Sequence, residues 1–289
     1  MGWKEAIETG GVAVVTGAAG GIGLAACERL TTLGLAPLMV DVDADALEAA
    51  RAHLLERSPG LSPERVRAVV ADVADADAVA RLADLAFADG EVAVLMNNAG
   101  IAPDSGAWRE PAAWGTIIDT NLFGVVNGLQ AFVPRMLEAG RPAAIVNTGS
   151  KQGITTPPGN PAYNVSKAGV KVVTEQLAHE LREAGAPLSA HLFVPGFVWT
   201  GMTRGERTEK PDAAWTPAQT IEYLFGRLEV GDFYVLCPDN DVPPERDRKR
   251  ILWAAGDIVE NRPALSRWDP AHAESFAVHE RQPDDPPSR

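Results

Sequence analysis

A tyrosine and a lysine four residues apart are the pair in this chain best suited to proton transfer. They are Tyr163 and Lys167, in a segment that otherwise has a helical pattern. Residues i and i+4 of a helix share one face, so the phenol and the ammonium are expected side by side. A neighbouring cation favours the phenolate and lowers the tyrosine pKa from about 10. The pair predicts a general acid/base, although a packed tyrosine beside a solvated lysine gives the same short motif.

A glycine-rich turn at residues 16–23 lies between an apolar run and a helical pattern. Its sequence is Thr-Gly-Ala-Ala-Gly-Gly-Ile-Gly. Glycines allow a tight turn and a close approach to a pyrophosphate, whose charge suits the amides at a helix N-terminus. A glycine-rich turn alone needs no ligand, but the strand–turn–helix context predicts a dinucleotide site. The predicted cofactor contacts here are Gly17, Gly20, Gly21, Ile22 and Gly23.

An aspartate ends the second apolar run, eighteen residues after Gly23. This residue, Asp41, is placed to accept hydrogen bonds from the ribose hydroxyls of adenosine and to repel a 2′-phosphate. Neither Gly20 nor Val42 supplies a cation for such a phosphate. The sequence therefore predicts NAD rather than NADP as the cofactor, with Asp41 and Val42 among its contacts. The same carboxylate can also cap the next helix.

Short apolar, β-branched runs alternate with longer helical patterns along most of the chain. Continuous apolar strands separated by helices indicate a parallel sheet that is covered on both faces. We predict a single-domain α/β fold, a doubly wound parallel sheet of the Rossmann type in three α/β/α layers. The strands are expected at Val12–Thr16, Leu38–Asp41, Arg67–Ala71, Val92–Met96, Ala143–Thr148, Ser189–Val194 and Phe233–Leu236.

The sequence pattern loosens after the sixth predicted strand. Residues 1–237 are predicted to form the dinucleotide-binding and catalytic domain, which includes a polar, irregular substrate loop at 197–220. Residues 238–289 are predicted to form a C-terminal extension, with a helix around 248–260 and disorder at 281–289. The aromatic residues of the extension are expected to pack in a core or subunit interface, or else to cover the active site: Trp253, Trp268 and Phe276.

Polar residues follow several of the predicted strands. Asp72 and Val73 follow the third, residues 98–100 (Asn-Ala-Gly) follow the fourth, and Ser150 ends the fifth, thirteen residues before Tyr163. The carboxyl ends of parallel strands share the edge where an open α/β sheet builds its crevice. Taken singly, each of these groups is more often a turn or a helix cap.

In this order of motifs the chain resembles the short-chain dehydrogenase/reductase family in its single-domain form. Residues 16–23 match Thr-Gly-x-x-x-Gly-x-Gly, residues 98–100 match Asn-Ala-Gly, and residues 163–167 match Tyr-x-x-x-Lys. The other matches are the helix asparagine Asn121, the active-site serine Ser150, and Pro195-Gly196 with Thr200. Together they cover about residues 10–200 in the order that the family shows.

The resemblance implies a role for each matching residue. Tyr163 would be the general acid/base, and Lys167 would lower its pKa and hold the nicotinamide ribose. Ser150 would hydrogen-bond the substrate oxygen, and Asn121 would fix a water that links Lys167 to solvent. The catalytic set would be Asn121, Ser150, Tyr163 and Lys167. Further cofactor contacts implied are Asp72, Val73, Asn98, Ala99, Gly100, Tyr163, Lys167, Pro195, Gly196, and, at the carboxamide, Val198 and Thr200.

Two segments depart from the family pattern. Gly149-Ser150 replaces the usual serine pair and is followed by Lys151, which is expected to point to solvent rather than to contact the substrate. After the last predicted strand, Cys237-Pro238-Asp239-Asn240 and some fifty further residues replace the usual glycine-rich ending. The departures put any transfer of oligomer geometry from the family in doubt.

The resulting functional prediction is an NAD(H)-dependent alcohol dehydrogenase or ketone reductase. It would transfer a hydride between nicotinamide and a secondary alcohol or ketone that is apolar, cyclic or aromatic. Two alternatives stay open: a non-catalytic dinucleotide-binding sensor or scaffold, and an epimerase or dehydratase on the same fold. A methyltransferase is disfavoured because it needs neither the tyrosine–lysine pair nor its spacing from the serine. The predicted substrate contacts are Ser150, Gln152, Tyr163, Trp199 and Met202.

Bulk composition limits the partners. A net charge of −13 and a pI of about 4.8 argue against nucleic acid or an anionic membrane as the main partner. No apolar run is long enough to span a bilayer, and the N-terminus lacks a signal-peptide pattern. Cys27 and Cys237 give neither a disulfide framework nor a metal site, so a cytoplasmic protein without a metal is predicted. A homodimer or homotetramer is expected from the resemblance.

Overall fold

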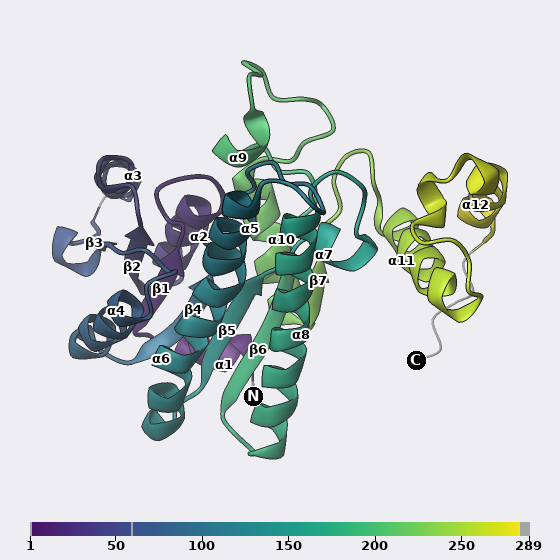
Figure 1. Cartoon of the computed structure of the whole chain (residues 1–289). Helices are drawn as coiled ribbons and strands as arrows, with labels where there is room; N and C mark the ends of the chain where they lie inside the picture. Colours follow the sequence, from purple (N-terminus) through teal and green to yellow (C-terminus); the bar gives the residue numbers. More distant parts are fainter. Residues whose placement is uncertain (1, 59, 284–289) are drawn as a thin grey trace.

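Seven parallel strands form the central sheet in a computed structural model that describes residues 2–58 and 60–283 (Figure 1). Their spatial order is β3-β2-β1-β4-β5-β6-β7, and every neighbouring pair is parallel. The predicted doubly wound α/β sheet is therefore confirmed. The strand bounds are β1 Val12–Thr16, β2 Ala36–Asp41, β3 Arg67–Val70, β4 Val92–Asn97, β5 Ala143–Thr148, β6 Leu188–Val194 and β7 Tyr234–Leu236.

Helices cover both faces of the sheet, because the buried strands alternate their side chains between the faces, with two large apolar cores and a smaller cluster at Val125, Val170, Leu192 and Val194. In β1, Ala13 and Val15 belong to one core, while Val12 and Val14 belong to the other. The first core also contains residues of α1, α2, α3 and α10, and the second contains residues of α4, α6 and α8. The helices are α1 Trp3–Glu8, α2 Gly21–Thr32, α3 Ala44–Arg57, α4 Ala76–Asp89, α5 Pro111–Ile118, α6 Gly124–Ala139, α7 Gln152–Thr155, α8 Pro161–Glu183, α9 Gly201–Arg204, α10 Pro217–Glu229, α11 Pro244–Val259 and α12 Ala273–Arg281.

The strand order reverses between β1 and β4, and this switch point locates the crevice. From β1 the chain runs outward through β2 and β3, then returns to β4 on the other side of β1. The connections that follow β1 and β4 therefore leave the sheet in opposite directions and open a gap at the carboxyl ends of these strands. The predicted site residues around 16–23 and 98–100 begin at this gap.

The predicted substrate loop at 197–220 contains more helix than expected. Residues 201–204 form α9, and the last four residues of the predicted loop are the first turn of α10. The hydroxyl of Thr216 accepts a hydrogen bond from the Gln219 amide (3.2 Å), and Pro217 occupies the first helical position. Thr216 and Pro217 are the residue types typical of a helix start, and the structure confirms that α10 begins at this pair.

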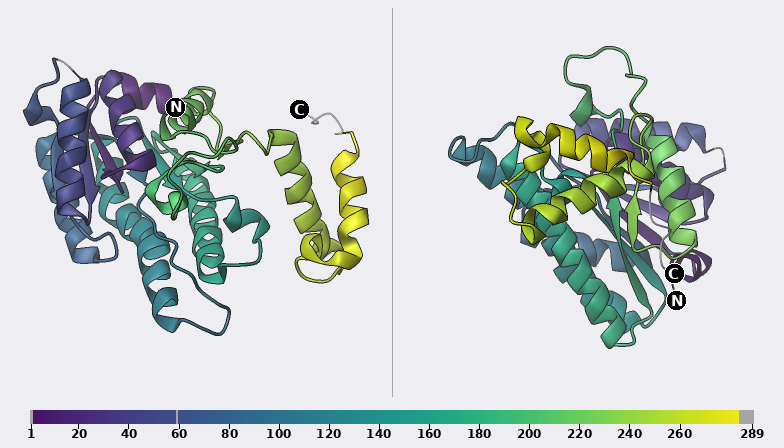
Figure 2. Two further views of the ribbon diagram at one scale, coloured as in Figure 1. Left: turned by 90° about the horizontal axis from the view of Figure 1, so that it is seen from above. Right: turned by 90° about the vertical axis from the view of Figure 1, so that its right-hand side faces the viewer.

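The C-terminal extension stands to one side of the sheet layers and meets the rest of the chain near α7 (Figures 1 and 2). The predicted helix around 248–260 is α11. Trp253 and Phe276 pack edge to face within the extension, with ring centroids 5.3 Å apart. Of the stretch predicted to be disordered, Arg281 ends α12, and residues 284–289 lie outside the described residues. The domain boundary after residue 237 stays a prediction.

Candidate active site

The glycine-rich turn is built so tightly that side chains are excluded at several positions. Gly17 and Gly21 have φ values of +69° and +53°, which favour glycine. A Cβ at Gly17 would lie 2.9 Å from the Ala99 Cα, and a Cβ at Gly23 would collide with the carbonyl oxygen of Gly17. At Gly20, by contrast, a Cβ would meet no protein atom within 4 Å. Gly20 therefore borders open space, as a cradle for a ligand requires.

Hydrogen bonds tie together the ends of the three strands beneath this turn. The Thr16 hydroxyl, at the end of β1, accepts hydrogen bonds from the Asn98 amide (2.9 Å) and the Ala99 amide (3.0 Å). The Asn98 side chain donates to the Thr16 carbonyl oxygen (3.0 Å) and accepts from the Thr148 hydroxyl at the end of β5 (3.3 Å). Asn98 thus fixes the floor of the crevice.

The Asp41 carboxylate fastens the end of β2 to the glycine-rich turn. Its Oδ2 accepts a hydrogen bond from the Ala19 amide (3.0 Å), and its Oδ1 accepts from the amides of Val42 (2.8 Å) and Asp43 (3.2 Å). Asp41 also borders the cavity described next. The carboxylate therefore places a fixed negative charge beside the glycine-rich turn.

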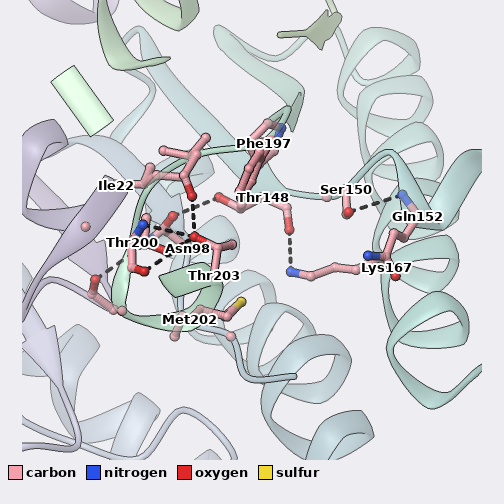
Figure 3. A pocket seen from close by; sticks show the side chains of 18 of the residues that line it. Ile22, Asn98, Thr148, Ser150, Gln152, Lys167, Phe197, Thr200, Met202 and Thr203 are labelled. Carbon is pink, nitrogen blue, oxygen red and sulfur yellow. Dashed lines mark hydrogen bonds between the residues drawn. The ribbon is translucent and has the colours of Figure 1, made fainter. Parts of the chain in front are cut away.

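A cavity of about 560 Å³ lies over the carboxyl ends of the central strands (Figure 3). It brings together most of the residues that were predicted for the site: Gly17, Gly20, Gly21, Ile22, Asp41, Asn98, Ala99, Gly100, Ser150, Gln152, Tyr163, Lys167, Pro195, Gly196, Val198, Thr200 and Met202. The lining also includes residues that were not predicted to be contacts: Thr148, Gly149, Lys151, Phe197, Gly201 and Thr203. Their proximity to motif residues is the only signal of them in the sequence.

Several predicted contacts lie outside this lining for identifiable physical reasons. Val42 is exposed, and Asp72 instead accepts a hydrogen bond from the Ala74 amide (2.9 Å). Val73 is buried against α6, where a Cβ at Gly124 would lie 2.6 Å from its side chain. The remaining predicted residues outside the lining are Gly23, which packs beneath Gly17; Trp199, whose amide donates to the Trp215 carbonyl oxygen (2.8 Å); and Asn121.

Asn121 is fully buried and braces the loop after β4 against α8. It lies in a single π-helical turn at Asp119–Phe123, a feature that often marks functional sites. Its side chain exchanges two hydrogen bonds with the backbone of Ile101 (2.8 and 2.9 Å) and donates to the Ser166 hydroxyl (3.2 Å). These contacts place Asn121 behind the cavity wall at Gly100. The water-fixing role implied by the resemblance stays a prediction.

Helix α8 presents Tyr163 and Lys167 to the same cavity. The helix begins just before Tyr163, because Asn160 caps the Tyr163 amide (3.2 Å) and Pro161 starts the first turn. The Lys167 Nζ donates to the Thr148 carbonyl oxygen (2.8 Å) and lies 5.8 Å from the centre of the Tyr163 ring. The two side chains therefore share one face of α8, as their spacing predicted.

The titration of this pair corrects the expectation that the lysine lowers the tyrosine pKa. Burial raises the pKa of Tyr163 above its ordinary value, and the neighbouring Ser150 hydroxyl acts in the opposite direction with a smaller effect. Burial also lowers the pKa of Lys167 to about 8. The prediction of a lowered Tyr163 pKa was wrong, because the spacing of two residues in the sequence does not show how deeply their side chains are buried. Removing water from the phenolate disfavours the charged form more than the hydrogen bond with the Ser150 hydroxyl favours it.

The depressed pKa of Lys167 predicts a pH-dependent cost in stability. The folded value, about 8, lies below the ordinary 10.5, so the unfolded chain binds more protons between them and stability rises with pH in that window. Replacing Lys167 with methionine removes this cost. We therefore compare the free energy of unfolding of the variant with that of wild type at each pH. The difference in favour of the variant should be larger near pH 7 than near pH 10, by up to about 3 kcal/mol.

Denaturant unfolding at the two pH values measures this difference. The variant also loses the hydrogen bond from Lys167 to Thr148, but this loss lowers its stability by a similar amount at both pH values and so does not affect the comparison. Lys171→Met is the matched control, since it removes another lysine from α8, one that pairs with Glu175 (2.8 Å). An equal stability change for Lys167→Met at both pH values would contradict the assigned pKa.

Ser150 and Lys151 begin the turn that leads into α7. The Ser150 Oγ accepts a hydrogen bond from the Gln152 amide (3.1 Å; Figure 3). The expectation that Lys151 points to solvent is wrong, because its side chain is only 20% exposed and its Nζ lies 2.6 Å from an Asp247 oxygen. The partner follows ninety-six residues later, where the sequence gives no signal of the contact.

Comparison with known proteins agrees with this geometry. The short chain dehydrogenase family model matches residues 11–211. The chain belongs to the short chain dehydrogenase family. Membership makes it an oxidoreductase of alcohol- or ketone-type substrates that uses a nicotinamide cofactor.

Individual relatives within the family cover nearly the whole chain. The 1-deoxy-11-beta-hydroxypentalenate dehydrogenase of Streptomyces exfoliatus is 40% identical over 92% of this chain and 97% of its own. The sulfoacetaldehyde reductase of Chromohalobacter salexigens is 35% identical, over 87% and 94% respectively. A crystal structure of a short chain dehydrogenase/reductase from Burkholderia phymatum in complex with NAD superposes with a TM-score of 0.64 at 30% identity, covering 97% of this chain and 98% of that one.

Two further observations concern the described part of the chain. Within residues 2–58 and 60–283, no helix combines the length and apolar character needed to cross a membrane. Over the same residues, no group of three His, Cys, Asp or Glu side chains is arranged to hold a metal ion.

Proposed function

We propose that this protein is an NAD(H)-dependent dehydrogenase/reductase of secondary alcohols and ketones. The observation that carries the proposal is the cavity that joins Tyr163, Lys167 and Ser150 to the glycine-rich turn and Asp41. A hydride transfer requires that cofactor and substrate be held close together while one proton moves. This cavity offers both a dinucleotide cradle and a positioned proton donor.

The residues present fit a nicotinamide dinucleotide. The open space over Gly20 accommodates a pyrophosphate near the N-terminus of α2, and Asp41 supplies an acceptor for ribose hydroxyls. The dinucleotide, when bound, supplies the hydride acceptor or donor. The carboxylate of Asp41 favours NAD, because a 2′-phosphate beside it would be repelled. The NAD complex of the Burkholderia phymatum relative supports a nicotinamide dinucleotide as the cofactor.

The chain's own groups handle the proton and the substrate oxygen. Tyr163 donates the proton when a ketone is reduced and takes it back when an alcohol is oxidised. The Ser150 hydroxyl, beside the phenol, holds the substrate oxygen by a hydrogen bond. Lys167, held by the Thr148 carbonyl oxygen, positions a cation beneath the site. Its amine is also placed to bind the ribose hydroxyls next to the nicotinamide.

An apolar wall supports a substrate that is itself largely apolar. Phe197, Met202 and Val198 line the cavity on the side of the segment after β6, with Gln152 as a polar contact near Ser150. The name of the Streptomyces exfoliatus relative describes a hydroxylated acid as the substrate of that enzyme. From the apolar lining we propose a secondary alcohol on an apolar skeleton, preferably a cyclic one, as the substrate class.

A cofactor and substrate screen tests the proposed function. Purified protein is incubated with NAD and cyclic, aromatic or open-chain secondary alcohols, and in the reverse direction with NADH and the matching ketones. We expect turnover, read by nicotinamide absorbance, with preference for cyclic apolar compounds. Binding of NADH without turnover across the panel would favour a sensor or scaffold. Turnover confined to small open-chain alcohols would overturn the substrate class alone.

We propose further that a second copy of the chain covers the exposed apolar side of the extension, which gives a homodimer or homotetramer. Ile258 and Val259 are 85% and 84% exposed at the end of α11, and Leu252 is 54% exposed on the same helix. Leu265 of the extension also borders a groove of about 630 Å³ shared with Trp108 of the main domain. Large apolar side chains exposed to this degree within one short segment support an interface that covers them.

Light scattering after size-exclusion chromatography tests this assembly. Wild type should elute as a dimer or tetramer, and the double substitution Ile258→Asp with Val259→Asp should shift it to the monomer. The matched control is Val230→Asp, because Val230 is similarly exposed (67%) but follows α10, away from the extension. A monomeric wild type would contradict the proposal.

The cytoplasmic location also stays a proposal, supported by the free thiols of Cys27 and Cys237.

A further inference from the structure

A buried cluster of one lysine and two aspartates lies directly behind the candidate catalytic serine. The Lys151 Nζ is 2.6 Å from the Asp247 Oδ2 and 3.5 Å from the Asp239 Oδ2. The aspartate side chains are only 8% and 7% exposed. We call these three residues the Lys151 cluster. Its members come from three separate segments: the turn after β5, the segment after β7, and the first turn of α11.

Asp239 connects the cluster to the segment that follows β6. Its Oδ2 accepts a hydrogen bond from the Phe197 amide (3.1 Å), and its Oδ1 accepts from the amides of Asp241 (3.2 Å) and Val242 (2.8 Å). A Cβ at Gly196 would lie 3.0 Å from the same Oδ2, so the chain passes unusually close to the carboxylate. Asp239 thereby fixes the backbone of Gly196 and Phe197, both of which line the cavity.

Lys151 connects the cluster to the serine turn and to α8. Its carbonyl oxygen accepts hydrogen bonds from the amides of Ile154 (3.1 Å) and Thr155 (3.0 Å), which closes α7 directly after Ser150. Within α7, Gly153 packs so closely on the backbone of Lys167 that a Cβ there would collide with it. A displacement of Lys151 is therefore passed to Ser150 on one side and to α8 on the other.

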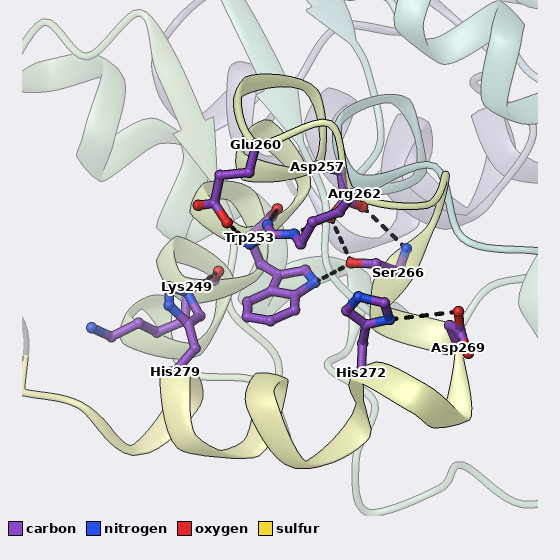
Figure 4. Close-up of polar contacts among 9 residues, drawn as sticks. All are labelled: Lys249, Trp253, Asp257, Glu260, Arg262, Ser266, Asp269, His272 and His279. Carbon is purple, nitrogen blue, oxygen red and sulfur yellow. Dashed lines mark hydrogen bonds and ion pairs between the residues drawn. The ribbon is translucent and has the colours of Figure 1, made fainter.

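Asp247 is presented to the cluster by a helix that is rigid in its own right. The extension has an internal network in which the Trp253 indole donates to the Ser266 hydroxyl (2.8 Å; Figure 4). Arg262 donates to Asp257 (2.9 Å) and to the Trp253 carbonyl oxygen (2.7 Å), with its guanidinium stacked 4.1 Å from the indole centre. α11 can therefore hold Asp247 in place against α7, an element of the main domain that it contacts.

We propose that the Lys151 cluster positions Ser150 and Phe197 for the reaction, and that the C-terminal extension takes part in this by supplying Asp247. This inference rests on the proposed function of the same cavity. Lys151, Asp239 and Asp247 are positioning residues, because they act through their neighbours rather than on the reacting atoms. Buried charges of this kind stay in place only when they are paired, so loss of one partner disturbs the others.

Removal of the lysine charge tests the positioning role. In Lys151→Met the two buried aspartates lose the ammonium that lies against them, while the apolar stem remains. Displacement of Ser150 should then lower kcat by about 10- to 100-fold, because small misplacements of reacting groups have effects of this size. NADH affinity should change less than kcat, since none of the hydrogen bonds that hold Asp41 to the glycine-rich turn comes from the cluster. Lys151→Arg should retain most of the activity.

Two further variants separate positioning from general damage. Asp247→Asn keeps the shape of the side chain and leaves Lys151 with Asp239 as a partner, so it should fold and still lower kcat. Lys171→Met is the matched control, because it breaks the ion pair with Glu175 (2.8 Å) on α8 outside the cavity lining and should leave kcat unchanged.

Hydrogen exchange supplies a readout that does not depend on turnover. In the free protein, Lys151→Met should speed exchange at amides 150–155 and 196–198, whereas Lys171→Met should not. If the wild-type protein turns over no alcohol or ketone, the proposed function is overturned. The hydrogen-exchange rates would still decide whether the Lys151 cluster orders residues 150–155 and 196–198. Unchanged exchange in Lys151→Met, or a kcat within about twofold of wild type for both cluster variants, would overturn the positioning role.

Discussion

Replacing Tyr163 with phenylalanine is expected to abolish most turnover while NADH binding persists. The change removes one oxygen and keeps the ring that packs beside Lys167. A positioned general acid/base contributes about 10²- to 10⁴-fold to rate, so kcat should fall within that range. Steady-state kinetics in both directions and NADH fluorescence titration measure the two effects. The substitution leaves the glycine-rich turn unchanged, so a variant that still binds NADH has kept its fold.

The matched control for this variant is Tyr234→Phe, because Tyr234 is half exposed in β7 and lies outside the cavity lining. It should retain wild-type kcat. If Tyr163→Phe keeps kcat within about twofold of wild type, the proton comes from another group and the assignment fails.

The raised pKa of Tyr163 adds a pH signature to the same experiment. At neutral pH the phenol is protonated, which suits ketone reduction, whereas alcohol oxidation needs the phenolate. Oxidation should therefore become faster as pH rises toward the tyrosine pKa, and reduction should become slower over the same range. The positive charge of oxidised nicotinamide, when bound, favours the phenolate and shifts the oxidation profile to lower pH. Tyr163→Phe should lose this pH dependence.

Replacing Asp41 is expected to change the choice between NAD and NADP. Removal of its charge takes away both the acceptor for ribose hydroxyls and the repulsion of a 2′-phosphate. A hydrogen bond to a charged group contributes about 1.5–3 kcal/mol. The ratio of kcat/KM for NAD over NADP should therefore fall by about 10- to 100-fold in Asp41→Ala, chiefly because NAD is used less well.

The role of Asp41 in holding the glycine-rich turn calls for two companion variants. Asp41→Asn removes the charge but keeps an acceptor for the Ala19 amide, so it isolates electrostatic discrimination from loss of the turn. Asp45→Ala removes an exposed acid from the first turn of α3, outside the cavity lining, and should leave the ratio unchanged. An unchanged ratio in both Asp41 variants would show that the cofactor is selected elsewhere.

The fold could be predicted closely because each strand of a covered parallel sheet is a continuous apolar run. β1 has all five residues buried, and β4 and β5 are buried throughout. The predicted strand ends differ slightly from the observed ones. β2 begins at Ala36 rather than at the predicted Leu38, because Ala36 and Pro37 pair with Val12 and Ala13 of β1. The candidate site followed from the sheet, since its residues lie at carboxyl ends of strands or on α8.

The features that sequence reasoning missed depend on contacts between distant segments. The pairing of Lys151 with Asp247 needs the path of the extension, which no local pattern describes. Phe197 and Thr203 line the cavity because the segment after β6 folds back as α9. The direction of the Tyr163 pKa depends on how completely water is excluded, and residue spacing does not contain that quantity.

Deuterium labelling follows the hydride from the cofactor to the substrate carbon. NADH with both hydrogens of the hydride-donating carbon replaced by deuterium is incubated with a cyclic ketone, and the product alcohol is examined by NMR. We expect deuterium on the carbinol carbon with wild-type protein, and a rate lower by about two orders of magnitude or more with Tyr163→Phe. An alcohol product without deuterium, or equal transfer by both proteins, would contradict it.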